Sequence, residues 1–339
     1  MAVKRRQPTM ADVGALAGVT DRTVSNVLSG KVPVRPGTRD AVLQAVQTLG
    51  YQMNPSARSL RTGRTGFLTL ALPDLTIDYF AELANAVLNE ADRLGWSVTV
   101  QQTSTLRERE LSLVSGAGRN FSDGLILLPH ALDSRDRNLL VTDLPMVLLG
   151  ERIFDGPVDH VTMSNVKAAQ AATDHLLSMG RRRIAAVGPN PADTTTTAAT
   201  LRLDGYRQAL RDAGIDVDPG LIAPAVAWNE AHGVKAVDAL VDHGVDFDAI
   251  FCFNDSLAFG VLHALRQRGI QVPHQVAVVG FDNVTATAYT SPPLTTIDSG
   301  VGVIAQTAVQ RLIGRILGTL DGAPEVFVAN FSLVRREST

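Results

Sequence analysis

The spacing of apolar residues changes near residue 66 of this 339-residue chain. Upstream of that point, apolar residues recur every three to four positions, which places them on one face of a helix. Downstream, short continuous apolar runs alternate with longer amphipathic stretches, a pattern typical of buried parallel strands joined by crossover helices. The sequence therefore predicts a small all-α unit followed by a larger α/β body.

Three short helices are expected in the N-terminal unit. Thr9 can cap the first helix, and Gly18 provides the tight turn after it because glycine tolerates positive φ. Thr20 is placed to cap the second helix, and a third helix runs from Thr38 to Gly50. The apolar faces of the first two helices are formed by Val13, Leu16, Ala17, Val24, Val27 and Leu28. Two helices joined by a short turn predict a helix-turn-helix headpiece.

The charge of the chain is as unevenly distributed as its apolar residues. The first 66 residues contain ten Lys/Arg and three Asp/Glu, whereas the whole chain has a net charge of −3. A basic segment attached to an acidic body is typical of a nucleic-acid-binding arm. In a helix-turn-helix, the second helix lies in the major groove and presents its N-terminal side chains to base edges.

The outward positions of the second helix supply the candidate DNA contacts. Together with the two capping residues, these candidates are Thr9, Thr20, Asp21, Arg22, Thr23, Ser25 and Asn26. Arg22 can pair bidentately with guanine, and Thr23 and Asn26 can contact bases or phosphate. Asp21 can accept a hydrogen bond from a cytosine amine or only favour the positive end of the helix dipole. Any three amphipathic helices would also give this spacing.

The body contains seven apolar runs that predict strands. These runs are 67–72, 96–100, 124–128, 145–149, 183–187, 249–253 and 276–280. A helix over 166–179 ends at Gly180, and a second series of strands and helices begins after it. Because right-handed crossovers between parallel strands build open sheets, the pattern predicts two doubly wound subdomains.

Ligands of open α/β sheets bind beyond the carboxyl ends of the strands. The polar and aromatic residues expected there are Asp74, Tyr79, Phe80, Gln102, His130, Arg202, Trp228, Asn254, Asp255 and Asp282. Carboxylates, a guanidinium and aromatic faces suit a ligand rich in hydroxyl groups. Structural alternatives stay open: Arg202 and Asp282 can pair with one another, and Trp228 can belong to the core. Asn254 and Asp255 can each cap the helix over 256–267, and we expect this role for Asp255.

Several classes of protein are disfavoured by the sequence. No run approaches the roughly twenty apolar residues that span a bilayer, and no signal peptide is recognised, so we expect a cytoplasmic protein without membrane contacts. Cys252, the one cysteine, lies in an apolar run and is expected to be a buried hydrophobe. The motifs of dinucleotide, nucleotide, serine-hydrolase and zinc-protease sites are not found, so no enzyme activity, cofactor or metal is expected.

Residues 9–62 resemble the headpiece and hinge of the lactose/galactose repressor (LacI/GalR) family. The matching segments are 10–19 (MADVGALAGV), 23–28 (TVSNVL), 49–51 (LGY) and 54–60 (NPSARSL). The resemblance implies a headpiece over 1–53 and a hinge helix with its linker over 54–66. It also implies that Leu60 wedges into the minor groove, with Asn54, Ala57 and Arg58 beside it. An apolar wedge of this kind unstacks a base step and bends the duplex.

The resemblance continues through the body at 67–330. It implies a fold similar to periplasmic sugar-binding proteins, with one subdomain over 67–163 plus 296–330 and another over 164–295. Leu294–Ile297 would be the return crossing between them. By position, Arg202 and Asp282 match the family's effector contacts, and Trp228 falls where an aromatic ring packs on a sugar. Departures from the family pattern at Gly150-Glu151 and Ser164-Asn165 affect the identity of the ligand.

These features together predict a regulator of transcription, most simply a repressor. We expect a homodimer that binds a palindromic operator in double-stranded DNA, associates with the nucleoid when bound, and responds to a small-molecule effector, a carbohydrate. A dimer is favoured over a tetramer because no leucine heptads follow residue 334. Two alternatives remain: a purine or nucleoside effector stacked on Tyr79 or Phe80, and a solute-binding protein without a role in transcription.

Overall fold

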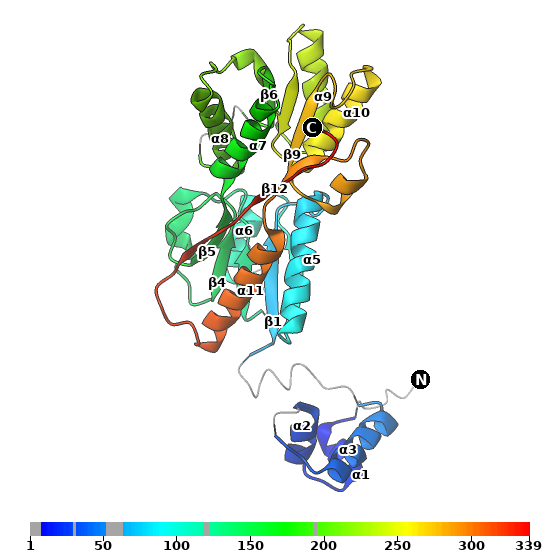
Figure 1. The fold of residues 1–339 in the computed structure, drawn as a ribbon. Helices are drawn as coiled ribbons and strands as arrows, with labels where there is room; N and C mark the ends of the chain where they lie inside the picture. Colours follow the sequence, from blue (N-terminus) through cyan, green and yellow to red (C-terminus); the bar gives the residue numbers. More distant parts are fainter. Residues whose placement is uncertain (1–7, 30–31, 52–63, 118–121, 191, 193–194) are drawn as a thin grey trace, which may run out of the picture. The chain divides into compact units, whose positions relative to one another are not determined.

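The computed structural model describes residues 8–29, 32–51, 64–117, 122–190, 192 and 195–339. The chain divides into two compact units, Met1–Thr65 and Gly66–Thr339. The first is helical and the second is built around two β-sheets (Figure 1).

Three helices form the N-terminal unit: α1 (Met10–Ala17), α2 (Asp21–Ser29) and α3 (Pro36–Leu49). Thr9 closes a capping box with Asp12 at the start of α1, and Gly18 ends the helix in the left-handed conformation with φ 66°. Gly50 ends α3 in the same way, with φ 61°. The third helix begins two residues before the predicted Thr38 because Pro36 is preorganised for a first helical turn.

The core of this unit is small and apolar. Its buried members are Val13, Val24, Val27, Val42, Ala45 and Tyr51. The prediction that Leu16 belongs to the apolar face of α1 is wrong, because 54% of this residue is exposed. On so short a helix, Val13 and the partly buried Ala17 are sufficient to cover the core.

The body contains two six-stranded sheets, and the first has the strand order β11-β5-β4-β3-β1-β2. Every neighbouring pair in it is parallel. Its strands are β1 (Phe67–Leu72), β2 (Ser97–Gln102), β3 (Gly124–Leu127), β4 (Met146–Leu149), β5 (Asp159–Met163) and β11 (Val326–Ala329). The helical segments of this subdomain are α5 (Asp78–Arg93), α6 (Arg107–Ser115), η1 (Ser134–Leu140) and α11 (Val301–Leu317).

The second sheet has the order β12-β10-β9-β8-β6-β7, with β12 antiparallel to β10 and the other pairs parallel. Its strands are β6 (Ile184–Val187), β7 (Ile222–Ala223), β8 (Ala249–Cys252), β9 (Ala277–Asp282), β10 (Thr295–Asp298) and β12 (Ser332–Val334). Its helical segments are α7 (Asn165–Ser178), α8 (Ala198–Asp212), η2 (Pro219–Leu221), α9 (Glu230–Asp242), α10 (Asp255–Gln267) and η3 (Thr285–Tyr289).

The chain passes between the two sheets three times: after β5, after β10, and between β11 and β12. Because β10 pairs with β9, the predicted return crossing at Leu294–Ile297 is wrong, and the chain returns only after Asp298. From there α11 packs against α5 and across β3, β4 and β5 (Figure 1). A Cβ on Gly124 would lie 2.8 Å from Leu312 Cδ1, so this glycine permits the close approach of α11 to β3.

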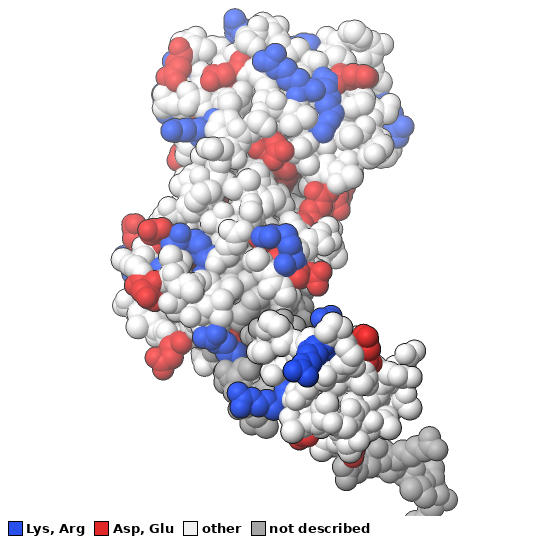
Figure 2. All heavy atoms as spheres, turned by 60° about the horizontal axis from the view of Figure 1, so that its bottom comes forward, with Lys and Arg blue, Asp and Glu red and all other residues white. Residues whose placement is uncertain are grey.

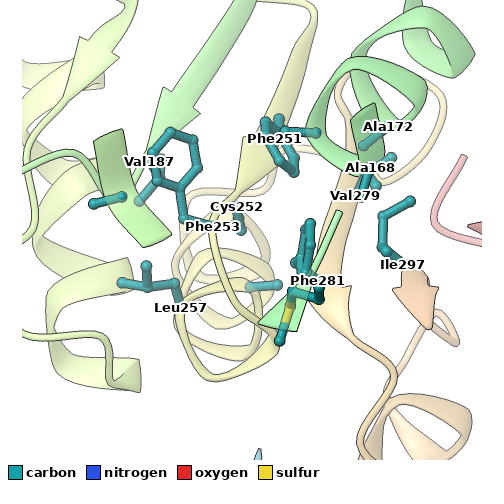
Figure 3. Packing of buried hydrophobic residues seen from close by; sticks show 14 of the residues in the cluster. Ala168, Ala172, Val187, Phe251, Cys252, Phe253, Leu257, Val279, Phe281 and Ile297 are labelled. Carbon is teal, nitrogen blue, oxygen red and sulfur yellow. The ribbon is translucent and has the colours of Figure 1, made fainter. Parts of the chain in front are cut away.

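Aromatic side chains fill the centre of the second subdomain. Phe251 and Phe253 lie on and after β8 with ring centroids 5.3 Å apart, and Phe281 lies on β9 (Figure 3). All three are fully buried. Cys252 lies between the two phenylalanines and is buried without a disulfide partner, in agreement with its interpretation as a hydrophobe.

Candidate DNA-binding and effector sites

The N-terminal end of α2 presents polar side chains. The Thr20 hydroxyl accepts a hydrogen bond from the Thr23 backbone N–H at 3.3 Å and lies 3.1 Å from the Thr23 hydroxyl, so it caps the helix as predicted. Asp21 and Arg22 are exposed, and Val24 holds the opposite side of the helix in the core. In the space-filling view, basic side chains of this unit group on the face shown and acidic ones lie at its margins (Figure 2). This geometry fits a helix that reads DNA through its first turn.

Two of the candidate DNA contacts, Ser25 and Thr9, do not have side chains that simply point outward and are free for DNA. The expectation that Ser25 is an outward position is wrong: the residue is only 9% exposed, on a helix that packs against both α1 and α3. The Thr9 hydroxyl lies 2.8 Å from Asp12 Oδ2 and accepts from the Asp12 N–H at 3.3 Å, so its side chain caps α1. Asn26 is half-buried. The hinge candidates Asn54, Ala57, Arg58 and Leu60 lie outside the described residues.

In the body, Arg202 of α8 is buried near the carboxyl ends of both sheets. Its Nε donates to Asn165 Oδ1 at 2.8 Å, and its Nη1 donates to the carbonyl of Phe253. Its Nη2 lies 3.6 Å from Met163 Sδ at the end of β5 and 3.7 Å from Asp282 Oδ1 at the end of β9. One guanidinium therefore contacts residues from both sheets of the body.

Aromatic rings flank the same guanidinium. Arg202 Cζ lies 3.5 Å from the ring centroid of Phe281 and 5.2 Å from that of Trp228. The Trp228 indole Nε1–H donates to the carbonyl of Gly188 at 2.8 Å, which fixes the orientation of its ring. A buried cation between aromatic faces is attracted by both ring quadrupoles. Trp228 as a whole is half-buried.

Asp282 combines a strained backbone with a buried carboxylate. Its φ is 118°, and φ of the next residue, Asn283, is 57°. Burial raises the pKa of Asp282 to about 7; Arg202 opposes this increase, whereas the charges of Glu151 and Glu82 add to it. Non-glycine residues at such φ values persist only where the surrounding structure imposes them, and they cluster at functional sites.

Further acidic groups face this position from the first subdomain. Glu151, two residues after β4, accepts a hydrogen bond from Asn165 Nδ2 at 2.8 Å, and burial raises its pKa. Burial also raises the pKa of the Tyr79 phenol, with smaller increases from Asp282 and Glu151. Glu82 of α5 accepts from the backbone N–H of Thr285 in η3 at 2.7 Å, a hydrogen bond that joins the two subdomains.

Comparisons with known proteins give the same division of the chain. Residues 9–54 match the family of bacterial regulatory proteins, lacI family, and residues 173–339 match the periplasmic binding protein-like domain. The HTH-type transcriptional regulator CelR of Thermobifida fusca is 33% identical over 99% of both chains. This chain belongs to the LacI family. It is a DNA-binding transcriptional regulator.

Solved structures of LacI-family regulators resemble most of the chain or nearly all of it. A transcriptional regulator from Sanguibacter keddieii is 42% identical over 81% of this chain and 98% of its own, with a TM-score of 0.75. The CelR–cellobiose complex is 29% identical, covers 98% of this chain and all of its own, and has a TM-score of 0.71. The Lac repressor dimer bound to operator and the anti-inducer ONPF is 26% identical, covers 98% and 99%, and has a TM-score of 0.82. The predicted fold class is thereby confirmed.

Four of the effector residues predicted for this LacI-family body lie in one cluster. Arg202, Asp282, Trp228 and Tyr79 are connected by the ion pair, the cation–π contact and the electrostatic interactions described above. Phe80 adjoins it, because its ring packs edge-on against Tyr79 with centroids 5.4 Å apart.

The other candidates have local structural roles. The Asn254 side chain caps α10 by accepting from the Leu257 N–H at 2.9 Å, and it donates to the Trp228 carbonyl at 3.1 Å. Asp74 accepts from the N–H and hydroxyl of Thr76, and Gln102 accepts from the Leu75 N–H. His130 is exposed, and its backbone N–H donates to Glu110.

The expected role of Asp255 is wrong. It does not cap α10, because Asn254 already does so one residue earlier. Instead, its buried carboxylate accepts from the Thr296 hydroxyl at 2.6 Å and from the Val284 N–H at 3.0 Å. These hydrogen bonds attach β10 and the residues after Asp282 to α10.

Glu151, Asn165 and Glu82 were not predicted as site residues. Glu151 and Asn165 drew attention only as departures from the family pattern, although Glu151 follows a strand just as Asp74 does. The strand-end argument could have included Glu151. Among the described residues, no helix could span a bilayer, and no group of three His, Cys, Asp or Glu side chains could hold a metal ion.

Proposed function

We propose that this LacI-family regulator is a repressor whose operator affinity is controlled by a carbohydrate bound around Arg202 and Asp282. The observation that carries the proposal is the buried pair itself, held 3.7 Å apart, beyond ordinary hydrogen-bond length. Adjacent hydroxyl groups of a sugar can donate to the carboxylate and accept from the guanidinium. A related regulator, CelR, has been solved in complex with cellobiose.

The aromatic groups around the pair support a carbohydrate. Trp228 and Tyr79 are both half-buried, so each ring keeps surface that can contact the apolar C–H face of a sugar. The nearby carboxylates of Glu151 and Glu82 add acceptors for further hydroxyl groups. This set of groups disfavours an anionic ligand, because one guanidinium faces several carboxylates.

The DNA-binding part of the proposal follows the helix-turn-helix. The N-terminal part of α2, with Asp21, Arg22, Thr23 and Asn26, reads bases or phosphates in the major groove. A homodimer pairs two such units on a palindromic operator. In the hinge, Leu60 acts as the minor-groove wedge beside Asn54, Ala57 and Arg58. The protein acts by binding and not by catalysis, in the cytoplasm, where its operator lies.

Calorimetry on substituted proteins tests the effector site. A thermal-shift panel of cellobiose, other neutral sugars and purine nucleosides first selects the tightest binder. We expect Asp282→Asn and Arg202→Met to weaken its binding by about tenfold or more each, since each removes a buried charged hydrogen-bond partner. Asp246→Asn, which alters a carboxylate with 86% of its side chain exposed, is the matched control and should leave the affinity unchanged.

The same experiment separates the alternatives. Unchanged affinity in both the Asp282 and Arg202 variants would place the effector elsewhere. Binding of nucleosides alone would replace the carbohydrate by a ligand stacked on Tyr79 or Phe80.

A further inference from the structure

Asn283, the residue after Asp282, contacts the end of β10, where the chain leaves the second sheet, and the C-terminal segment that follows β12. Its side-chain Nδ2 donates to Asp298 Oδ2 at 3.2 Å, and its Oδ1 accepts from Arg336 Nη2 at 2.8 Å. Asp298 is the last residue of β10, immediately before the chain crosses to α11. Arg336 lies two residues after β12, the strand that follows the third crossing.

Both partners of Asn283 are themselves fixed within these segments. Asp298 Oδ1 accepts from the Gly300 N–H at 2.8 Å, at the residue that precedes the first turn of α11. Arg336 donates through Nη1 to the Leu294 carbonyl at 2.7 Å and through its backbone N–H to the Thr295 hydroxyl at 2.8 Å. One side-chain amide therefore connects the start of α11, which covers the first sheet, with the C-terminal segment of the second sheet.

The backbone at this position makes the connection sensitive to Asp282. Asp282 and Asn283 have consecutive positive φ values, 118° and 57°. Asn283 also donates from its backbone N–H to the Thr296 hydroxyl at 3.4 Å. Asparagine tolerates the left-handed region, whereas an aspartate at 118° is strained, so the contacts of Asn283 help to hold Asp282 in place.

We propose that Asn283 is a positioning residue that couples Asp282 to the crossing segment at Asp298–Gly300 and to the C-terminal segment at Arg336. The proposal rests on the proposed function, because it takes Asp282 as the carboxylate of the effector site. A change in the hydrogen bonding of Asp282 alters the strained peptide that it shares with Asn283. The amide of Asn283 then shifts relative to Asp298 and Arg336 together, and the relative position of the two subdomains follows. Such coupling requires an element with two arrangements whose equilibrium is shifted by binding at the site.

Hydrogen exchange of the full-length protein, without any effector, tests the coupling as a double-mutant cycle. Asp282→Asn changes the hydrogen bonding at the effector site, and Asn283→Gly removes the amide while keeping a residue that adopts positive φ freely. In the native background, we expect Asp282→Asn to change exchange in peptides covering 298–303 and 332–338 by about threefold or more, a coupling of the size found between contacting residues. In the Asn283→Gly background, the further change should disappear.

Non-additivity distinguishes coupling from a merely structural role. If Asn283 only stabilised its surroundings, Asn283→Gly would raise exchange by itself and Asp282→Asn would add the same change in both backgrounds. That additive result would overturn the proposal, as would an Asp282→Asn variant that leaves both peptides unaltered in the native background. Asp246→Asn serves as the remote control.

A second variant covers the case in which Asn283→Gly does not fold. Asp298→Asn keeps an oxygen for the Gly300 N–H but places an amide donor opposite the Asn283 amide, so it should also abolish the effect of Asp282→Asn. Because no effector is added, this result is independent of the calorimetric test. If calorimetry shows that the sugar binds at Asp282 but the exchange changes are additive, only the coupling through Asn283 is refuted. If calorimetry instead places the sugar elsewhere, the exchange cycle can still be interpreted.

Discussion

The carboxylate of Asp282 is held in the protein interior at a cost that depends on pH. Burial raises its pKa from 3.8 to about 7, so the folded state binds a proton more tightly than the unfolded chain does. The stabilising effect of that proton is complete below the unfolded pKa and is lost as pH rises through the folded value. Stability therefore falls between about pH 4 and pH 7 through this group.

Urea unfolding at pH 5.5 and pH 8 checks this expectation. We predict that the free energy of unfolding contributed by Asp282 declines by roughly 2 kcal/mol over this interval, and that Asp282→Asn removes that decline. The comparison between the two proteins isolates Asp282 from the other titrating groups. An identical pH dependence in both would show that the carboxyl of Asp282 titrates as it does in the unfolded chain.

Individual site residues could be predicted from sequence when their place at a strand end or at a matched family position was enough to locate them. Arg202 and Asp282 were expected at strand ends or matched a family position, and they lie together. The burial of Ser25 could not be predicted, because it depends on how the helices of the N-terminal unit pack. The choice of Asn254 over Asp255 as the cap of α10 could not be predicted either, because both residue types cap helices. Exposure of a helix residue is decided by packing as well as by spacing.

At the scale of elements, we expect helix α2 to determine which operator is read. Arg22 is exposed at its first turn, where a guanidinium can pair bidentately with a guanine. We predict that Arg22→Ala weakens binding to the selected operator by about 1–3 kcal/mol and relaxes the preference at one base pair. Fluorescence anisotropy with the operator and its single-base variants measures both effects.

An exposed arginine on α3 provides the control for Arg22. Arg39→Ala should weaken binding to all sequences equally, if it has any effect, because a phosphate contact carries no base preference. If Arg22→Ala also weakened all sequences equally, the direct reading of a base by this residue would be refuted.

Most of the strands that the apolar pattern predicted lie at the sheet centres, and one, β2, lies at an edge. All seven predicted runs contain a strand, whereas β5 begins with Asp159 and His160 and was not recognised. Asp159 is buried and would have a raised pKa, but hydrogen bonds from Arg315 and Arg311 on α11 lower the pKa to about 2. A polar start to a buried strand is possible only because a distant helix supplies its partners.

At the scale of the whole molecule, the course of the chain between the sheets was the least predictable feature. The C-terminal segment returns to the second subdomain, where the Ser338 hydroxyl donates to the Val278 carbonyl at 2.6 Å and the Val278 N–H donates to the Ser338 carbonyl at 2.8 Å. Such contacts join residues far apart in sequence, and no local sequence pattern predicts them. Two doubly wound sheets could be predicted. The sheet to which each of the last three strands, β10, β11 and β12, belongs could not be predicted.

The two units of the chain also differ in charge, and they separate the segment expected to bind DNA from the site expected to bind the effector. The basic first 66 residues contain the segment that matches the lacI family, whereas the acidic body contains the cluster around Arg202 and Asp282. The central claim is that occupancy of this cluster changes operator affinity. Allosteric coupling of this kind is a difference in free energy, so it can be measured without knowledge of the pathway.

The most direct test is operator binding by fluorescence anisotropy with and without the sugar selected by thermal shift, in the native protein and in Asp282→Asn. We predict that saturating sugar changes operator affinity by about fivefold or more in the native protein, within the usual range of allosteric coupling, and by much less in Asp282→Asn. A sugar that binds tightly in the cluster and leaves the operator affinity of the native protein unchanged would contradict the account.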